Sequence, residues 1–429
     1  MSRSLPSVLA NNAPSRLPRD SDKPLFDLTI QVVTPIFGGG AKAGVPDGLA
    51  PIRGSSIRGQ LRFWWRACNA HLHPDAASLF EAESKLWGQT SKNDSTIKAP
   101  SSIVIEVDEQ IAGNVVPPNS PGYPAYALFP FRGQDGRPDI NGRSGVSFNL
   151  RVSLAHHVRD IDRDLYKKEV EAALWAWITF GGFGARTRRG CGSLWCDNSE
   201  FHPESVETVQ SWVTEKMARH VAPSDPAVAV RHHSPRLRGG NLIVKESGQT
   251  AIAAWGTSIS VMKEFRQWKT TSQSDWPEAD SIREIARTHS FGHDPKHPAR
   301  QYFPRAEYGM PIIFHFKDRH SGDPSDHALQ PRLDGVSRMA SPFILKPLMV
   351  TQQVGVPIVL LLKCPFVSSA ALKVPVMLNG TEVAPADIQN TSKSQDVPPL
   401  ASTGATNARI ALARFAINQW NPNARNVQL

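Results

Sequence analysis

The sequence predicts an α+β fold, because short alternating apolar patterns typical of strands lie between longer patterns with helical spacing. In chain order, the first 200 or so residues predict strand, helix, strand, strand, helix and strand. This is the βαββαβ order of a ferredoxin-like unit, the topology that RNA-recognition modules also use. We expect a second, divergent unit of the same kind in the rest of the chain, with glycine-rich loops and long insertions.

The four strands of the first unit are predicted from alternating apolar residues, at residues 26–34, 102–107, 147–154 and 193–196. Its two helices are predicted at residues 55–72 and 165–180, and Ser55 or Ser56 is the expected N-cap of the first. A further helical turn is expected at residues 76–86. Residues 112–146 are rich in Pro, Gly, Asn and Ser and predict a long irregular connection.

The pattern weakens after about residue 200. We expect a helix at 251–269, strands at 312–316, 343–350 and 357–362, and a helix at 405–420. Residues 221–240 resemble a linker or exposed loop, and residues 381–407 resemble a mobile loop. We therefore divide the chain into a disordered leader (1–24), a first ferredoxin-like domain (25–220) and a second, divergent one (221–429).

The chain of 429 residues carries a net charge of +9 and has a pI near 9.5. This excess of cations favours a polyanionic partner, although a basic surface also serves solubility. No run of about eighteen apolar residues predicts a membrane span, and no secretory leader is evident. The four cysteines form no C-x-x-C pair, so we expect neither zinc knuckle nor disulfide framework, and a cytoplasmic location.

Residues 181–193, GGFGARTRRGCGS, form the most informative loop. Glycine permits positive φ and close backbone approach, and arginine offers a planar fork of donors that suits phosphate oxygens. The loop therefore fits a phosphate cradle. In the alternative interpretation, Gly181 and Gly182 only cap the preceding helix and the arginines are solvated.

The first predicted helix carries an arginine stripe, which we define as Arg58, Arg62 and Arg66. Residues four apart lie on one helix face, and no carboxylate occurs among residues 51–74. A solvated charged face is the alternative. We expect replacement of all three arginines by alanine to weaken binding of RNA. Nearby aromatic side chains are candidates for stacking on bases, although one of the two tryptophans is expected in the core: Phe37, Trp64, Trp65 and Phe183.

Candidate catalytic and metal-binding residues have simpler explanations. Asp160, Asp162 and Asp164 lack the remaining ligands of a calcium loop, and prolines interrupt the spacing of His289, His293 and His297. His71 and His73 at the end of the first helix suit a favourable dipole contact better than a general base. No phosphate loop, H-E-x-x-H or nucleophile elbow is present. We therefore expect no enzyme activity, metal or cofactor.

Binding of RNA is the coherent hypothesis. The candidate RNA-binding residues come from the two glycine-rich loops and the first helix: Gly38, Gly39, Gly40, Lys42, Arg53, Ser55, Ser56, Arg58, Arg62, Arg66, Gly181, Gly182, Gly184, Arg186, Arg188 and Arg189. In a βαββαβ unit the first and fourth strands are neighbours, so these elements are expected on one face or edge. Contacts mainly to phosphates would be largely independent of sequence.

Three segments resemble the RAMP superfamily of CRISPR proteins, and more narrowly a RAMP subunit of the type III-B (Cmr) effector. They are VTPIFGGGAKAG, PIRGSSIRGQLRFWWRA and FGGFGARTRRGCGSL. Residues 338–347, RMASPFILKP, also resemble a family segment. The resemblance is dense over 27–72 and 174–195 and patchy over 335–365.

The resemblance implies two ferredoxin-like domains and a subunit that holds the 3′ spacer end of guide RNA at the head of the complex. Its implied partners are guide and target RNA, a neighbouring RAMP subunit and the repeated backbone subunit, in antiviral defence. In that family, target cutting belongs to the backbone subunit. The alternative is a metal-independent RAMP endoribonuclease that processes CRISPR RNA with His71 or His73 as base.

Overall fold

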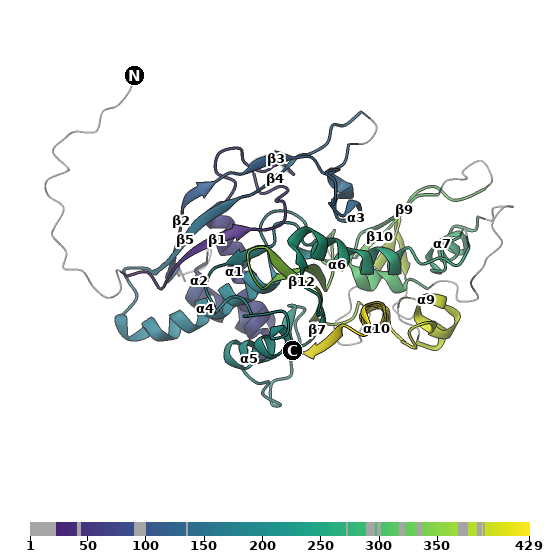
Figure 1. The fold of residues 1–429 in the computed structure, drawn as a ribbon. Helices are drawn as coiled ribbons and strands as arrows, with labels where there is room; N and C mark the ends of the chain where they lie inside the picture. The colour runs from purple at the N-terminus through teal and green to yellow at the C-terminus, as the bar shows by residue number, and fades with distance from the viewer. Residues whose placement is uncertain are drawn as a thin grey trace, which may run out of the picture.

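The computed structural model is a mixed α/β protein whose described strands pair only in antiparallel fashion (Figure 1). The predicted class is confirmed at this level. The described residues are 23–429 without 41–43, 90–99, 134–135, 272, 289–296, 298–301, 317–321, 333–336, 368–375, 384–387 and 389–390. The predicted leader lies outside them up to residue 22.

The first sheet has the strand order β2-β5-β1-β6. Its strands are β1 (Phe26–Val32), β2 (Ile103–Ile111), β5 (Ser147–Leu154) and β6 (Leu194–Cys196). Helix α1 (Gly54–Asn69) connects β1 with β2, and α4 (Arg163–Phe180) connects β5 with β6. The predicted βαββαβ order is therefore present in this half, and β1 pairs with β6 as expected.

One face of this sheet is covered and the other is open, which explains the alternation in the sequence. In β5, every second residue from Phe148 to Leu154 is buried beneath α1 and α4, and the intervening residues are partly exposed. Helix α1 begins at Gly54 after Arg53, without a side-chain cap, so the N-cap predicted at Ser55 or Ser56 is wrong. An added Cβ on Gly54 would lie 3.2 Å from the Ile105 carbonyl oxygen, so packing on β2 determines this start.

The second sheet has the order β11-β12-β7-β15. Its strands are β7 (Arg236–Lys245), β11 (Phe343–Met349), β12 (Val354–Lys363) and β15 (Ala424–Gln428), and β8 (Gln249–Thr250) pairs with β12. Helix α6 (Ala251–Arg266) follows β7, and α10 (Ala408–Trp420) precedes β15. Strand and helix order thus repeat the arrangement of the first half, with long insertions.

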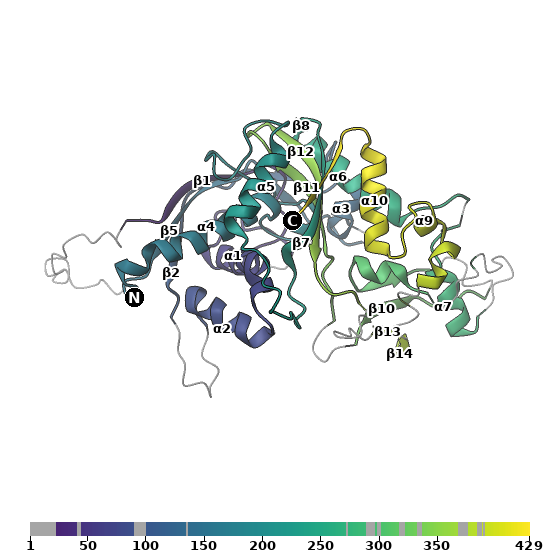
Figure 2. The same cartoon turned by 90° about the horizontal axis from the view of Figure 1, so that it is seen from below.

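The second sheet is buried on both faces. Figure 2 shows it edge-on, with α1 and α4 on one side and α6 and α10 on the other. Leu348 and Ile358 belong to the core that contains α1 and α4, whereas Leu345 and Val359 belong to the core around α6 and α10. A strand covered on both sides has no polar alternation, so β11 is buried at every position. One face of the second sheet consequently completes the core of the first half, and its other face forms a second core with α6 and α10.

The insertion at 112–146 is not irregular, contrary to the prediction. It contains the hairpin β3 (Asn114–Val116) and β4 (Gly142–Ser144), helix α3 (Ala125–Leu128) and the 3-10 turn η4 (Phe129–Phe131). Leu128 and Phe131 are buried, and the Phe131 ring stacks on Phe37 with centroids 4.6 Å apart. Because these apolar anchors hold the segment, its turn-rich composition did not make it a loose loop.

A third sheet, β14-β13-β10-β9, lies beside α7 (Glu278–Ala286). Its strands are β9 (Ile312–Phe314), β10 (His327–Pro331), β13 (Val376–Leu378) and β14 (Thr381–Val383). The remaining described helices include α2 (Ala76–Trp87), the unpredicted α5 (Val209–His220), η6 (Thr187–Arg189), η7 (Pro304–Tyr308) and α9 (Pro398–Ala401).

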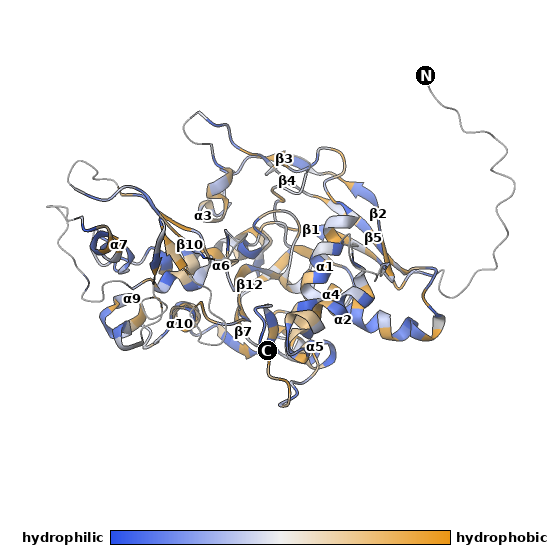
Figure 3. Ribbon diagram, turned by 180° about the vertical axis from the view of Figure 1, so that it is seen from behind, coloured by the Kyte–Doolittle hydropathy of each residue, from blue (hydrophilic) through white to orange (hydrophobic). Residues whose placement is uncertain are grey.

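Two predicted loops need correction. The stretch 221–240 already includes the first residues of β7, which pair with the C-terminal end of β12. The described part of 381–407 contains β14, η9 (Thr391–Asp396) and α9. In α10, Leu412 is buried and Ile410 is exposed. Hydrophilic and hydrophobic residues alternate around the helices in Figure 3. Within the described chain, no helix is both long and apolar enough to cross a membrane.

Candidate nucleic-acid interface

The loop 181–193 is fixed by the first half of the molecule. The Thr34 hydroxyl donates to the Gly190 carbonyl over 2.6 Å, and the Ala185 amide donates to the Phe37 carbonyl over 2.6 Å. Phe37 precedes the other glycine-rich loop, so the two loops are in contact. The sequence prediction that they share one region is confirmed.

The second half of the molecule holds the same loop from the other side. The Trp255 indole on α6 donates to the Arg189 carbonyl over 2.6 Å. The Arg188 guanidinium donates to the Ser341 carbonyl, and that of Arg189 to the Phe343 carbonyl over 3.1 Å. The loop is therefore a rigid element between the halves.

Glycine is required in this loop by close packing. Gly190 has φ +78°, and an added Cβ would lie 2.5 Å from the Trp255 ring. Gly181 ends α4, because its amide donates to the Trp177 carbonyl over 2.8 Å, and an added Cβ would lie 2.5 Å from Trp64 Nε1. The capping role that the sequence suggested for Gly181 is thus present. Gly182 and Gly184 pack on backbone of the Gly192 and Phe37 regions.

The first glycine-rich loop, which follows Phe37, packs against the loop 181–193. Gly38 approaches the Ala185 side chain, and the Gly39 carbonyl accepts a hydrogen bond from the exposed Arg53 guanidinium. Gly40 donates its amide to the Val45 carbonyl over 2.9 Å. Lys42, a predicted phosphate contact, lies outside the described residues.

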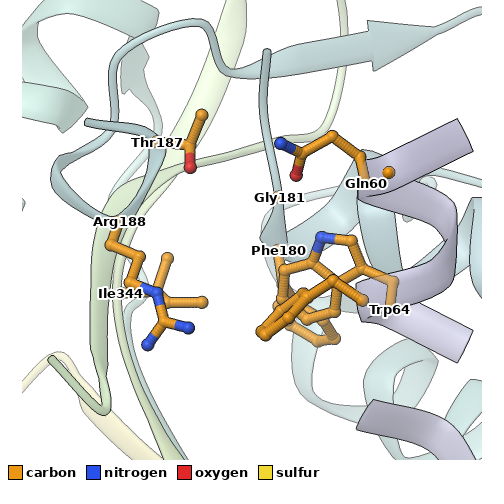
Figure 4. A pocket seen from close by; sticks show the side chains of 9 residues that line it. Gln60, Trp64, Phe180, Gly181, Thr187, Arg188 and Ile344 are labelled. Atoms are coloured by element: carbon orange, nitrogen blue, oxygen red, sulfur yellow. The ribbon is translucent and has the colours of Figure 1, made fainter. Parts of the chain in front are cut away.

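A cavity of about 240 Å³ separates α1 from the loop and from β11 (Figure 4). Gln60 and Trp64 face it from α1, Thr187 and Arg188 from the loop, and Ile344 from β11. Phe63 also lines it, and the Arg188 guanidinium lies 5.3 Å from the centre of the Phe63 ring. An added Cβ on Gly59 would meet nothing within 4 Å, so the helix leaves room here.

Two further cavities continue from this one. The second, about 300 Å³, shares Arg188 with the first, and the third, about 470 Å³, shares Tyr126 and Arg186 with the second. We call the three together the central groove. Its cationic lining residues come from three segments, the insertion, the loop 181–193 and α6: Arg132, Arg186, Arg188, Arg189, Lys263 and Arg266.

Among the described residues, no Asp or Glu lines the central groove. Within the described chain, Arg132, Arg186, Lys263 and Arg266 form no ion pair, and the Nε atoms of Arg132 and Arg186 are buried without a hydrogen-bond partner. Burial lowers the pKa of Arg186, and it lowers that of Arg189 to about 9, which leaves Arg189 charged at neutral pH. An uncompensated cation in such a site favours an anionic ligand.

The arginine stripe of α1 faces away from this groove. Arg62 donates to the buried Glu83 carboxylate of α2, and Arg66 pairs with it at 2.7 Å. Arg58 donates to the Ser101 hydroxyl and, over 3.0 Å, to the Ile103 carbonyl. The carboxylate that residues 51–74 lack is supplied by the next helix. The groove is instead lined by the neighbouring face of α1.

The remaining predicted site residues are partly accessible or buried. Ser55 is exposed and Ser56 is half-buried at the start of α1. All four aromatic candidates for base stacking are buried, so the stacking expectation is wrong for Phe37 and Phe183, whereas burial of one of Trp64 and Trp65 was expected and both are buried. Their rings fill the contact between α1, α4 and the two loops.

Of the two histidines of the alternative enzyme hypothesis, His71 is buried and His73 is half-buried. His71 is 3% exposed, and its Nε2 lies 2.8 Å from the Ala222 carbonyl oxygen. Burial lowers the pKa of both His71 and His73. His297 contacts Asp280 at 2.8 Å, whereas His289 and His293 lie outside the described residues. In the described part of the chain, no three His, Cys, Asp or Glu side chains could hold a metal.

Sequence patterns missed several groove residues. Tyr126, Lys263 and Arg266 come from segments that carry no glycine or arginine motif, and the fold alone brings them to the loop. One pattern did point to the groove: Met339 and Ser341 line it, and both belong to the segment 338–347.

Residues 29–195 match the family model of the RAMP superfamily. The predicted resemblance to this superfamily is therefore confirmed for the part of the chain that contains α1 and both glycine-rich loops.

Similarities to individual proteins are as follows. The chain is 29% identical over 191 residues to the CRISPR system Cmr subunit Cmr1-2 of Pyrococcus furiosus, which covers 40% of this chain and 92% of that protein. Among solved structures, Cmr1 from Pyrococcus furiosus in its apo form matches with a TM-score of 0.46 and 15% identity, over 79% of this chain and 88% of that one. A chain of the type III-B Cmr-beta complex bound to cognate target RNA matches with a TM-score of 0.45 and 10% identity, over 80% and 97%.

Proposed function

We propose that this chain is a non-catalytic RNA-binding subunit of a type III-B CRISPR effector, in which the central groove holds the guide RNA. The match of residues 29–195 to the RAMP superfamily and the similarity to a protein named as a Cmr subunit support the assignment. We also propose that residues 25–220 and 221–429 are two ferredoxin-like domains. Their support is the common strand order of the two large sheets.

The observation that carries the proposal is the lining of the groove. Six cationic side chains surround three adjoining cavities without any Asp or Glu in the lining. Arginine presents donors that fit phosphate oxygens, and each neutralised phosphate releases counterions. A sugar-phosphate chain therefore satisfies these side chains better than a neutral ligand does.

The finer assignment follows the family resemblance. We propose that the RNA is the 3′ spacer end of the guide, and that target RNA, a neighbouring RAMP subunit and the backbone subunit are the other partners. The protein would act in the cytoplasm in antiviral defence. A groove that contacts phosphates would accept any spacer sequence, which is what a guide-holding subunit requires.

The direct test is a titration of labelled single-stranded RNA with the full-length chain at several salt concentrations. We expect measurable affinity that falls steadily with salt, by about 0.7 logarithmic units per contacted phosphate for each tenfold increase. Two RNAs of unrelated sequence should bind similarly. Absence of RNA affinity, or affinity indifferent to salt, would contradict the proposal and favour a subunit that binds only protein.

The non-catalytic part needs its own test. We expect purified protein incubated with repeat RNA in EDTA to leave the RNA intact, because His71 is buried and His73 is half-buried beside it. Specific cleavage that disappears in a His71→Ala, His73→Ala double variant would overturn this part and support the endoribonuclease alternative.

A further inference from the structure

The insertion that contains α3 and η4 forms one wall of the third cavity of the central groove. This cavity, about 470 Å³, is lined on that side by Tyr126, Phe129 and Arg132, and on the opposite side by Lys263 near the end of α6. Arg186 of the glycine-rich loop closes it. Its volume falls within the range of roughly 300–1,000 Å³ of sites for small ligands.

The insertion holds its shape because its neighbouring residues are anchored. Leu128 is fully buried, and Phe131 stacks on Phe37 of the first glycine-rich loop. The Ile140 amide donates to the Phe131 carbonyl over 2.8 Å. Phe129 lies between these two anchors and is nevertheless 59% exposed. A rigid backbone therefore presents an apolar ring to solvent at the edge of the cavity.

Cationic side chains without ion-pair partners among the described residues line the same cavity as this ring. Arg132 and Arg186 each have a buried Nε atom without a hydrogen-bond partner among the described residues, and Lys263 is exposed and has no ion pair there. A planar apolar surface beside unpaired guanidinium groups suits a ligand with a flat ring and an adjacent negative charge. In single-stranded nucleic acid, a base and its flanking phosphates have this chemistry.

We propose that this cavity is a nucleotide subsite, in which Phe129 stacks on one unpaired base and Arg132, Arg186 and Lys263 contact the flanking phosphates. This inference rests on the proposed RNA-binding function and deepens it. Phe129 of the insertion thereby supplies the stacking contact that the sequence suggested for four other aromatic residues. Those four are buried: Phe37, Trp64, Trp65 and Phe183. The subsite adds affinity without base-specific hydrogen bonds, because every base has a π face.

The experiment uses the full-length chain, single-stranded RNA with one 2-aminopurine, and three variants. Phe129→Ala should weaken binding about fivefold, the low end for stacking on an exposed ring. It should also restore the 2-aminopurine fluorescence that stacking quenches in the wild type. Phe129→Tyr should keep both affinity and quenching. Ile313→Ala is the matched control, because Ile313 is 60% exposed and lies outside the groove.

The outcomes separate the two proposals. If Phe129→Ala binds like Ile313→Ala while the variant Arg186→Ala, Lys263→Ala, Arg266→Ala binds more weakly than the wild type, Phe129 does not stack on a base and the proposed subsite is wrong, whereas the groove remains supported as a binding site for phosphates. If neither change weakens binding, the proposed function fails as well. Quenching that persists in Phe129→Ala would also overturn the stacking role.

Discussion

Two sets of arginines lie in opposite electrostatic surroundings: the stripe of α1, predicted from the sequence to bind RNA, and the arginines of the central groove, which were predicted only in part. The arginine stripe of α1 bonds within the chain, and Arg62 and Arg66 share the buried Glu83 carboxylate. The central groove has no carboxylate among its lining residues, and Arg186 and Arg266 form no ion pair in the described chain. A cation that has an internal partner contributes to the fold, whereas one without a partner is available to a ligand.

The spacing of arginines in a helix therefore does not reveal whether they bind a ligand or stabilise the fold. Glu83 lies in the next helix, and only the packing of α1 against α2 brings it to the stripe. Likewise, Arg266 reaches Arg186 only because α6 packs beside the loop. The predictions below test whether the two sets act differently.

The largest expected effect is on stability. Arg62→Ala with Arg66→Ala leaves Glu83 buried without a cation, which should lower the free energy of unfolding by about 3 kcal/mol, at the lower end for a broken buried pair. Denaturant unfolding measures this, and RNA affinity of the folded variant should not change. Lys85→Ala, which removes an exposed pair with Glu81, is the control and should cost less than about 1 kcal/mol. If the double variant is as stable as the wild type but binds RNA more weakly, the arginine stripe contacts RNA and this account is wrong.

A second prediction concerns Lys346 on β11, a buried cation whose Nζ donates to the Thr179 carbonyl over 2.9 Å. Burial lowers its pKa from 10.5 to about 7. Between these values the unfolded chain binds the extra proton, so the free energy of unfolding should rise with pH, by up to about 1.4 kcal/mol per pH unit. Lys346→Met should remove this part of the rise between pH 7 and 10. Identical pH profiles for wild type and variant would show that burial does not penalise this charge.

A smaller effect is expected where α6 holds the loop. Trp255→Phe removes the indole that donates to the Arg189 carbonyl and should cost about 1 kcal/mol of stability, the contribution of one hydrogen bond. Because Arg189 then loses its fixed position, RNA affinity should fall as well. Trp212→Phe is a suitable control, since the Trp212 Nε1 atom has no hydrogen-bond partner among the described residues. Equal RNA affinity in the two variants would contradict the role of this anchor.

The first half of the fold could be predicted largely because its sheet is covered on one face. The strand expected at 147–154 has those bounds in the structure, since its alternation records one buried and one open side. The bounds of β12 were less accurate: residues 357–362 were expected, and the strand spans Val354–Lys363. Both of its faces are buried, so its composition carries no alternation.

The candidate site was predictable only in part. Both glycine-rich loops were identified from composition, and they do meet in the structure. Tyr126 and Lys263, in contrast, are separated by more than a hundred positions and become neighbours only through the placement of the insertion beside α6. Such contacts depend on tertiary packing, which local pattern does not encode.

The central claim is tested most directly by the salt dependence of RNA binding in two triple variants that lose equal charge. Arg186→Ala, Lys263→Ala, Arg266→Ala removes unpaired groove cations. Lys85→Ala, Arg159→Ala, Arg332→Ala removes exposed cations that pair with Glu81, Asp162 and Glu382. We expect the groove variant to lose affinity and about 2 units of the logarithmic salt slope, and the control to retain both. Equal slopes in the two variants would contradict the claim that the groove holds the RNA backbone.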